Sequence, residues 1–594
     1  MINRIKNIRI NNKGKHKSLK KAVAILFPLF LVFLTESVHT NSLSKILAFT
    51  VNNPKTIIFS FLVVSMIYTA LVSLTRSVTW AAAVSSLLFF TFAVVEYFKF
   101  KSSGTHFNIS DLKMSATAGN MSDFAVIRPT AGMIIGGLLL FSYIFLIFLL
   151  NIKINVKRFL AVCSSFSIAM IFMFFIAIEP VYGLVYTIFE ISTEDDNNVF
   201  LSREIFTENK LIANLTQSLS REFSRLTKTP ENYSFEKVSQ YLSGNRNKKT
   251  PRKSDDVQPN VIVIMSESFA DMRLIDGIYV PDGVYDDFDE LKTYGFSGMS
   301  FVPAFGGNTV KTEFELLFGL PLKSLGNAPI PPSLIEVDGE TEETFAKLYS
   351  TAGYSAFYIH PFKAGFYNRD KVYSEFGFDR LIFDEDLTTD ITYFGNYIDD
   401  ETVFKQIQSI LEGQSADYKP NSPSYIFATT MQNHMPYINE DFDGSELDYY
   451  FSGIKQTSHA LFEFYEYIMT FEEPTTVLFV GDHYPSFSTD SSAYVAADIT
   501  AENCYEFYIQ PYLVLSNFDI DYGVFPEDCV SAFYLPHLLI SAIGLPTDDF
   551  IDTFLSMVEH TPVYTDVGLF LPQNEKFDML TYDRTRGHRY SVYD

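Results

Sequence analysis

The N-terminal part of the chain contains five apolar stretches, each near the length that a helix needs to cross a membrane. A spanning helix takes roughly 20 apolar residues. Charged residues are rare inside these stretches, with Glu96 and Glu179 near their ends, which disfavours a transporter. The first stretch contains Pro28 and has a short apolar core, so a signal peptide is the alternative there. We expect five transmembrane helices, at about 22–38, 57–75, 78–98, 131–150 and 159–178.

The charge of the chain changes sign after these stretches. Residues 1–183 carry 18 Lys/Arg and 5 Asp/Glu, a net charge of +13, so the total of −25 leaves −38 for residues 184–594. Lys and Arg accumulate before the first stretch, which predicts a cytoplasmic N-terminus. Five crossings then put everything after residue 183 outside the membrane. So acidic an outer part is not expected to bind nucleic acid.

The outer part separates into a connector and a folded domain. Residues 184–256 are polar and helix-prone, which predicts a helical connector after a transmembrane anchor at 1–183. From residue 257 onward, short β-rich apolar runs alternate with helical patterns. This alternation predicts an α/β domain over 257–594 with a central, mostly parallel sheet. The clearest strand candidates are Val261–Met265, Ser355–Ile359, Tyr425–Thr429 and Thr476–Val480.

Polar side chains that suit catalysis follow each of these four strand candidates. In open α/β sheets, ligands bind beyond the carboxyl ends of the strands. Four separate strands would therefore deliver carboxylate and imidazole groups to one edge of the sheet. The sequence predicts an active site at that edge, built from Glu267, His360, His434, Asp482 and His483.

Three of these side chains are of the kind that bind a divalent cation. Glu267, Asp482 and His483 supply oxygen and nitrogen ligands that suit Mn²⁺ or Mg²⁺, and also Zn²⁺. Their distance in sequence leaves an alternative open. In it, Asp482 caps a helix and His483 hydrogen-bonds a loop.

A glycine-rich turn leads into an amphipathic helical pattern at residues 305–320. Thr309 falls in the first turn of this helix, where backbone N–H groups and the helix dipole favour an anion. A threonine hydroxyl bound there to a metal becomes a usable nucleophile. The alternative is a simple N-cap, with Thr312 or Glu313 completing a capping arrangement.

Residues 358–370 combine a histidine, an arginine and an aromatic pair. His360 and Arg369 suit a phosphate group, and Phe366 and Tyr367 suit a small polyol. The alternative is a surface loop in which Arg369 forms a local ion pair with Asp370.

Five short sequence motifs, in their order along the chain, resemble those of the lipoteichoic acid synthase family of membrane-bound phosphoglycerol transferases, in the alkaline phosphatase and sulfatase superfamily. The resemblance covers roughly residues 255–560, and a five-helix anchor also fits it. The family commonly has tryptophan where this chain has Tyr367. The motifs are Glu-Ser-Phe at 267–269, Gly-x-Thr-x-x-x-Glu-Phe within 306–314, Phe-Tyr-Asn-Arg-Asp at 366–370, Asn-His-Met-Pro-Tyr at 433–437 and Gly-Asp-His-Tyr-Pro at 481–485.

The resemblance implies a role for each candidate residue. One divalent metal, usually manganese or magnesium, would be held by Glu267, Thr309, Asp482 and His483, with Thr309 as the nucleophile. His434 would contact the phosphoglycerol group, and either His434 or His360 would move a proton. The other substrate-binding residues implied are His360, Phe366, Tyr367 and Arg369.

The implied reaction has two steps and takes place at the outer face of a bacterial cell membrane. Thr309 attacks the phosphorus of phosphatidylglycerol and releases diacylglycerol. A hydroxyl of a surface glycan or teichoic acid then accepts the glycerophosphate group. The identity of this acceptor is open on the sequence.

Several other functions are alternatives to phosphoglycerol transfer. A phosphoethanolamine transferase usually carries several disulfides, whereas this chain has only Cys163, Cys504 and Cys529, and pairing of the last two is left open. A sulfatase would need a Cys/Ser-x-Pro-x-Arg motif, which is missing around Thr309. A phosphodiesterase that uses water as the acceptor stays possible. So does a catalytically silent scaffold that binds glycans.

Overall fold

The computed structural model divides the chain into two compact units. One unit comprises Met1–Leu112 with Ala125–Thr227, and the other comprises Lys113–Phe124 with Lys228–Asp594. The boundary at residues 227 and 228 falls inside the segment that the sequence predicts as a single connector. The described residues are 17–112, 128–152, 162–169, 179–193, 199–227, 229–242, 258–326, 328, 331–334, 340–414, 422–437, 442–487, 504–567 and 571–592.

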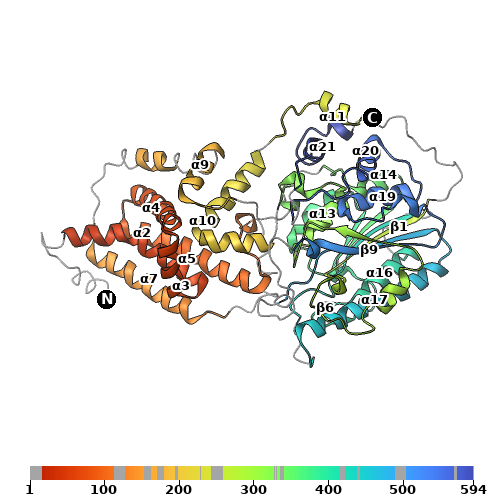
Figure 1. Ribbon diagram of the computed structural model, residues 1–594, viewed down its shortest axis with the longest axis horizontal. Coiled ribbons are helices and arrows are strands. Elements are labelled where there is room, and N and C mark those ends of the chain that lie inside the picture. The colour runs from red at the N-terminus through yellow and green to blue at the C-terminus, as the bar shows by residue number, and fades with distance from the viewer. Residues whose placement is uncertain are drawn as a thin grey trace. The chain divides into compact units, whose positions relative to one another are not determined.

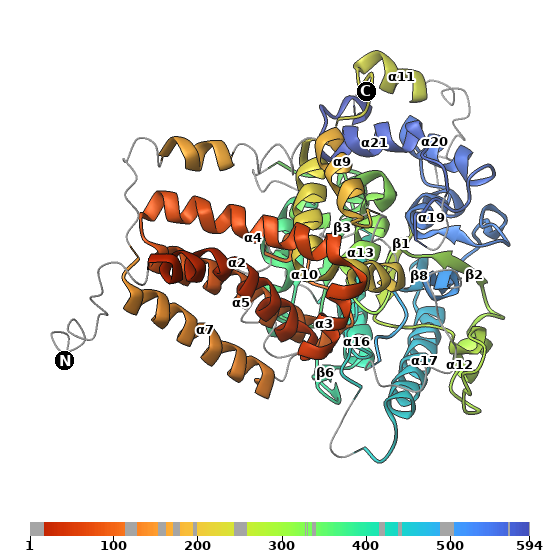
Figure 2. The same cartoon turned by 60° about the vertical axis from the view of Figure 1, so that its left-hand side comes forward.

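The first unit is a bundle of helices. Four of its helices are long and apolar enough to cross a membrane, and they run side by side (Figure 2). Further helices of this unit are α3 (Leu43–Asn52), α9 (Glu179–Phe189) and α10 (Val199–Thr227). The four long helices are α2 (Lys17–Thr40), α4 (Pro54–Thr75), α5 (Val78–Ser103) and α7 (Ala131–Leu150).

The structure corrects the prediction of five membrane helices to four within the described residues. The fifth stretch, 159–178, lies largely outside them, and only residues 162–169 are described there, as helix. The first stretch is longer than its apolar core suggests, because α2 continues through Pro28 for 24 residues.

A buried glutamate joins α2 to α10. The backbone of Lys210 leaves the helical region (φ 61°, ψ −178°), which interrupts α10 and exposes new N–H groups. The Glu36 carboxylate accepts hydrogen bonds from the N–H groups of Leu211 and Ile212, each at 3.1 Å. It thereby caps the second half of α10.

The second unit contains an eight-stranded sheet (Figure 1). The strand order is β10-β2-β9-β8-β1-β7-β3-β4, with parallel pairing throughout except on the two sides of β9. A separate antiparallel pair comprises β5 (Tyr393–Phe394) and β6 (Tyr397–Ile398). The strands of the large sheet are β1 (Asn260–Ser266), β2 (Phe296–Phe301), β3 (Ser355–Ile359), β4 (Arg380–Ile382), β7 (Ser424–Thr429), β8 (Thr475–Gly481), β9 (Ile509–Ser516) and β10 (Val530–Ser531).

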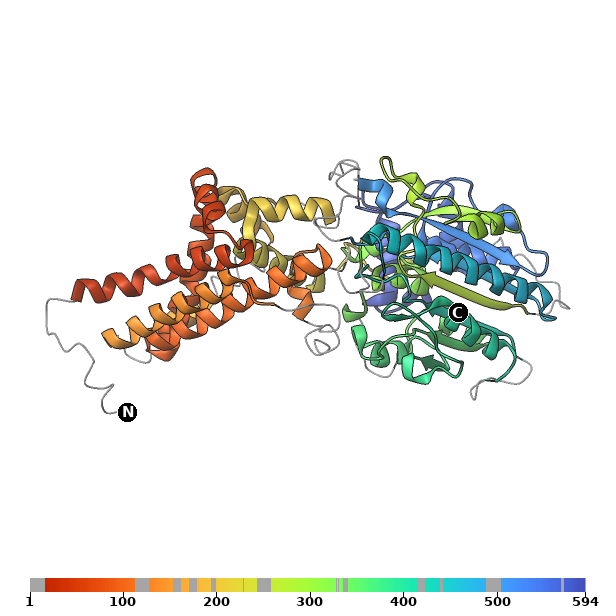
Figure 3. The same cartoon turned by 90° about the horizontal axis from the view of Figure 1, so that it is seen from below.

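All four predicted strands are confirmed, as the neighbours β8, β1, β7 and β3. Every residue of these four strands is buried. Helices cover both faces of a parallel sheet, and its strands are therefore continuous apolar runs. The helix α17 runs along one face (Figure 3), together with α12 and α16. These are α12 (Asp286–Leu291), α16 (Asp400–Leu411) and α17 (Glu446–Thr470).

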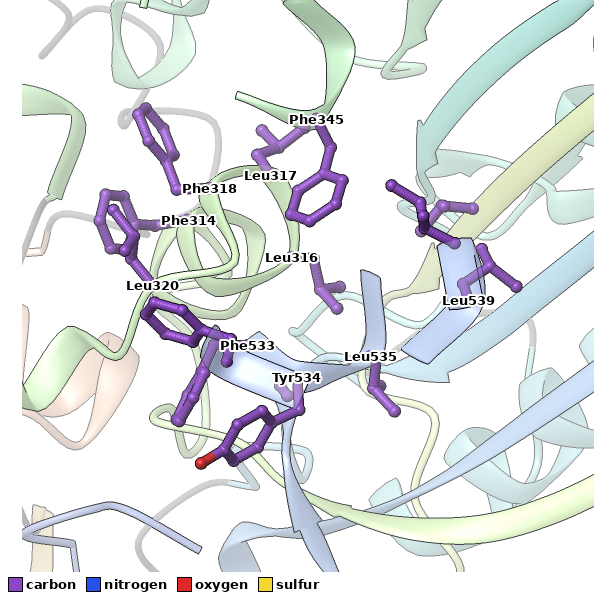
Figure 4. Close-up of a cluster of buried hydrophobic side chains, with 14 of the residues drawn as sticks. Phe314, Leu316, Leu317, Phe318, Leu320, Phe345, Phe533, Tyr534, Leu535 and Leu539 are labelled. Carbon is purple, nitrogen blue, oxygen red and sulfur yellow. The ribbon is translucent and has the colours of Figure 1, made fainter. Parts of the chain in front are cut away.

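The other face carries a second layer of helices and the main hydrophobic core. The helix α13 lies in this layer, and its apolar side chains, among them Phe314 and Leu317, pack against Phe345, Phe533 and Leu539 (Figure 4). This packing fixes the position of α13 and of the residues at its N-terminus. The helices of this layer and its surroundings are α11 (Phe235–Leu242), α13 (Val310–Phe318), α14 (Phe345–Thr351), α19 (Leu535–Ala542), α20 (Asp549–Val558) and α21 (Glu575–Thr585), and the short α15 (Arg369–Val372) lies near the active edge.

One glutamate of α13 is buried in this layer. Glu315 is 3% exposed and accepts a hydrogen bond from the N–H of Leu322 at 2.9 Å. Burial raises the pKa of Glu315 to about 8.

We predict that Glu315→Gln removes a loss of stability that the wild type shows as the pH rises from about 5 to about 8. Between the ordinary pKa of glutamate and about 8, the folded protein retains a proton that the unfolded chain releases, so stability falls as the pH rises through this window. The stability of the variant relative to the wild type should therefore increase from pH 5 to pH 8, by at most about 1.4 kcal/mol per pH unit. Thermal unfolding in detergent at three pH values tests this. Parallel pH profiles would contradict it.

Candidate functional site

The carboxyl ends of β1 and β8 bring three metal-binding side chains together. Glu267 follows β1, and Asp482 and His483 follow β8, which is the parallel neighbour of β1 in the sheet. One ligand atom from each of the three lies within 4.8 Å of the others, and all three side chains are buried. The edge that the sequence predicts as the active site thus holds a compact donor cluster.

The protonation of His483 follows from its backbone contact. Its Nδ1 lies 2.9 Å from the Tyr484 carbonyl oxygen and must donate to it, which puts the ring lone pair on Nε2. Burial also holds the pKa of His483 below its ordinary value, which favours this neutral ring. Nε2 lies 3.2 Å from Asp482 Oδ2 and 3.6 Å from Glu267 Oε1. Three electron-pair donors therefore face one another without a proton between them.

The pKa values and hydrogen bonds of the two carboxylates also indicate a metal site. Burial raises the pKa of Asp482 to about 7, and burial together with the charge of Asp482 raises the pKa of Glu267. Asp482 Oδ1 accepts the N–H of Ser268 at 2.7 Å, whereas the buried Oδ2 has no hydrogen-bond donor among the described residues. A divalent cation would satisfy these atoms, so the cluster fits a metal ion. The alternative in which Asp482 caps a helix is wrong.

Thr309 occupies the N-cap position of α13 but does not act as a cap. Its side chain makes no capping hydrogen bond. The hydroxyl instead donates to Glu267 Oε2 at 3.2 Å and lies 3.4 Å from His483 Nε2. The capping alternative fails also for its proposed partner Thr312, whose hydroxyl donates to the Asp482 carbonyl at 2.8 Å.

Gly306 and Gly307 shape the turn that presents Thr309. Both have positive φ values, 63° and 131°, and Asn308 follows with φ 65°. A Cβ on Gly306 would lie 3.0 Å from the Cβ of Ser486, in addition to the strain of its backbone. Glycine is therefore required where the chain turns toward the donor cluster.

Glu313, one turn beyond Thr309, is the centre of a second buried group. Its Oε2 accepts from Arg369 Nη2 at 2.9 Å and from Nε at 3.3 Å, and also from the hydroxyl of Tyr373. Its Oε1 accepts from Tyr358 at 2.6 Å and from Thr429 at 2.7 Å. Neither Glu313 nor Arg369 is exposed to solvent. The alternative of a surface loop with a local Arg369–Asp370 ion pair is wrong.

His360 extends this group toward the edge of the sheet. Its Nδ1 lies 3.1 Å from the carbonyl oxygen of Thr429, and its Nε2 lies 3.3 Å from Arg369 Nη1. Burial and then the charge of Arg369 hold the pKa of His360 well below its ordinary value, so the ring is neutral.

His434 lies on the loop after β7. Its Nδ1 lies 2.6 Å from the Met435 carbonyl oxygen and 3.2 Å from the hydroxyl of Tyr397. Donation to the carbonyl puts the ring lone pair on Nε2. His434 is partly exposed, unlike His360.

The aromatic pair lies over the arginine. The guanidinium carbon of Arg369 is 5.2 Å from the ring centre of Tyr367 and 5.9 Å from that of Phe366. Tyr367 also packs against Val310, the residue after Thr309. The sequence-predicted substrate residues are thus gathered next to the first turn of α13.

Sequence reasoning missed two residues of this site. Glu313 was present in a motif, but no role in binding or positioning was given to it. Its spacing of four residues from Thr309 puts both on one helix face, which was the available signal. Ser268 was the other, and its hydroxyl donates to Glu267 Oε1 at 2.9 Å.

We predict that Mn²⁺ raises the melting temperature of the full-length protein and that Asp482→Asn abolishes this shift. A cation that binds only the folded state stabilises it by mass action, and the variant lacks one anionic ligand. Differential scanning fluorimetry with and without Mn²⁺ measures the effect. Glu315→Gln, which neutralises a buried carboxylate outside the cluster, should keep the shift. An equal shift in Asp482→Asn would contradict the metal site.

Part of the chain is similar in sequence to known proteins. The sulfatase family profile matches residues 259–522. A protein named for cyclic beta-1,2-glucan modification from Rhizobium meliloti (strain 1021) is 30% identical over 261 residues, which are 41% of this chain and 39% of that protein. A lipoteichoic acid synthase from Staphylococcus saprophyticus is 27% identical over 246 residues, 38% of this chain and 36% of the synthase. The matches thus span about two fifths of these relatives.

A solved structure shares the fold. The Streptococcus pyogenes phosphoglycerol transferase GacH, in complex with sn-glycerol-1-phosphate, superposes with a TM-score of 0.51 at 21% identity. The match covers 61% of this chain and 97% of that one. The resemblance inferred from five motifs is confirmed at the level of the domain, because residues 259–522 match the sulfatase family.

Proposed function

We propose that this protein transfers a glycerophosphate group from phosphatidylglycerol to a hydroxyl of a surface glycan or teichoic acid, through a covalent intermediate on Thr309. The observation that carries the proposal is the position of the Thr309 hydroxyl, 3.2 Å from Glu267 Oε2 and 3.4 Å from His483 Nε2. A hydroxyl directed into a cluster of metal ligands, rather than onto its own helix, has the placement of a nucleophile.

The first step forms the intermediate. A divalent cation held by Glu267, Asp482 and His483, with manganese as our first choice, would lower the pKa of the Thr309 hydroxyl. Thr309 Oγ1 attacks the phosphorus, and the bond from phosphorus to the diacylglycerol oxygen breaks. The proton of Thr309 passes through His434 to the departing oxygen, which leaves as diacylglycerol.

The second step reverses these roles. The acceptor hydroxyl attacks the phosphorus and gives its proton to His434. The bond from phosphorus to Thr309 breaks, and the Thr309 oxygen regains a proton. We assign this proton transfer to His434 rather than to His360, because both ring nitrogens of His360 are engaged in buried hydrogen bonds.

The membrane unit supports a lipid as the donor. A tether to the membrane raises the effective concentration of lipid head groups at the site. Four helices of this unit are long and apolar enough to cross a membrane.

The relatives support a glycan as the acceptor. Two of them are named for cyclic beta-1,2-glucan modification and for capsular polysaccharide biosynthesis, and a third is named a lipoteichoic acid synthase. The three names share carbohydrate or polymer hydroxyls at the cell surface. We therefore propose an acceptor of this chemical class.

We predict that Thr309→Ala abolishes the Mn²⁺-dependent release of diacylglycerol from phosphatidylglycerol, because the variant lacks the attacking oxygen. Thr309→Ser should keep part of the activity, and mass spectrometry of the wild type should find glycerophosphate on Thr309. Thr312→Ser is the control on the same helix, since it retains the hydroxyl that binds the Asp482 carbonyl. Full activity of Thr309→Ala would overturn the assignment.

We predict that the effect of His434→Gln depends on the leaving group. The loss with phosphatidylglycerol should be about 100-fold or more, because the diacylglycerol oxygen needs a proton as it leaves. The first turnover of bis(p-nitrophenyl) phosphate should fall less, since nitrophenolate leaves without a proton and only the transfer of the Thr309 proton to His434 is lost. Rapid-mixing kinetics with both donors measures the difference. Equal losses would contradict the role of His434 as proton donor.

A further inference from the structure

The carboxylate of Glu313 is buried behind the site and is surrounded by donors. Its two oxygens accept five hydrogen bonds, from Arg369 twice and from Tyr358, Tyr373 and Thr429 once each. Two of these bonds come from the guanidinium of Arg369, which stays protonated and can only donate, so the contact with Glu313 is an ion pair. The geometry therefore describes an ionised carboxylate.

Arg369 is the one cation bound to this carboxylate. Both groups have no exposed surface, so water does not screen the pair. The guanidinium also reaches His360, which is neutral, and lies against the rings of Tyr367 and Phe366. Taken together, this half of the site contributes no net charge.

The other half of the site balances in the same way. Glu267 and Asp482 supply two negative charges, which would match a divalent cation, and His483 supplies none. A site of this kind suits a ligand with a single negative charge better than one with two. Phosphodiesters carry one negative charge near neutral pH, whereas phosphomonoesters carry nearly two.

We propose that Glu313 is a specificity-determining positioning residue that neutralises Arg369 and thereby sets the preference of the site for singly charged phosphodiesters over doubly charged phosphomonoesters. Glu313 acts through Arg369 and does not touch the substrate. This inference rests on the proposed function, because it concerns how the same pocket chooses its phosphoryl donor.

Two chromogenic donors of different charge test the proposal in the full-length protein with Mn²⁺. They are bis(p-nitrophenyl) phosphate, a monoanion, and p-nitrophenyl phosphate, a dianion at pH 8. In each, attack by Thr309 releases nitrophenolate, and water then takes the place of the acceptor. The readout is the ratio of kcat/KM for the monoester to that for the diester. This ratio does not change when a variant merely contains less folded protein.

A charge series gives the expected order of this ratio. Glu313→Gln leaves Arg369 unbalanced and should raise the ratio about 10-fold or more, as expected for one unit charge near a partly buried phosphoryl group. Arg369→Gln leaves Glu313 unbalanced and should lower the ratio below that of the wild type. The double variant Glu313→Gln/Arg369→Gln restores neutrality and should return the ratio to within about 3-fold of the wild type, although its absolute rate falls.

Two matched controls separate charge from packing. Tyr373→Phe removes one hydrogen bond from Glu313 and keeps the charge, so the ratio should stay unchanged. Glu315→Gln neutralises the other buried glutamate of α13, which binds Leu322 rather than Arg369, and should also leave the ratio unchanged. A shift of the ratio in either control as large as that in Glu313→Gln would overturn the proposal.

The outcomes distinguish this inference from the function on which it rests. A wild type that cleaves neither donor, or a Thr309→Ala variant that cleaves both as well as the wild type, would overturn the proposed function. Cleavage that depends on Thr309, with a ratio that stays constant across the charge series, would overturn only the role of Glu313. If Glu313→Gln does not fold, Arg369→Gln and the double variant decide, because the ratio should lie below the wild type in the first and near the wild type in the second.

Discussion

Two buried carboxylates at the ends of adjacent parallel strands constrain the whole catalytic unit. Burying charge without compensation is costly, and the raised pKa values of Glu267 and Asp482 express that cost. His483 adds a lone pair rather than a proton to the same space. The strands β1 and β8 are continuous apolar runs buried on both faces, so they hold these groups in place despite their mutual repulsion.

The helix α13 connects the hydrophobic core to the donor cluster. Its body is fixed by the hydrophobic cluster around Phe314 and Leu317. At its N-terminus, Thr309 meets the donor cluster, and Thr312 fastens the helix to the backbone of Asp482. Glu313 then ties the same turn to β3 and β7 through Tyr358 and Thr429. One short helix therefore sets the distance between the proposed nucleophile Thr309 and the groups that would bind the phosphate.

The sequence predicted the parts of this arrangement that depend on local patterns. The four central strands were readable as short apolar runs, and the polar residues after them pointed to one edge because parallel strands end together. The pairing of Glu313 with Arg369 was not readable, because 56 residues separate them along the chain. The short helix α3 was missed because its ten residues are too few to cross a membrane.

In the helical bundle, too, contacts between residues distant in sequence could not be predicted. Four spans could be predicted from length and apolar composition alone, but the interruption of α10 at Lys210 could not. It depends on a carboxylate from α2, Glu36, that reaches the freed N–H groups from far away in the sequence. A polar residue inside an apolar stretch is therefore ambiguous until the partner helix is known.

The net charge of the second part of the chain and the charge balance inside its site have different consequences. Residues 184–594 carry a net charge of −38, which repels an anionic membrane surface and its anionic lipids. A tether of apolar helices overcomes this repulsion without adding positive charge to the domain. With the proposed lipid donor, the site would need no strong excess of positive charge, because the tether would already bring the two together. A balanced pair such as Glu313 with Arg369 could then select by ligand charge, as we propose.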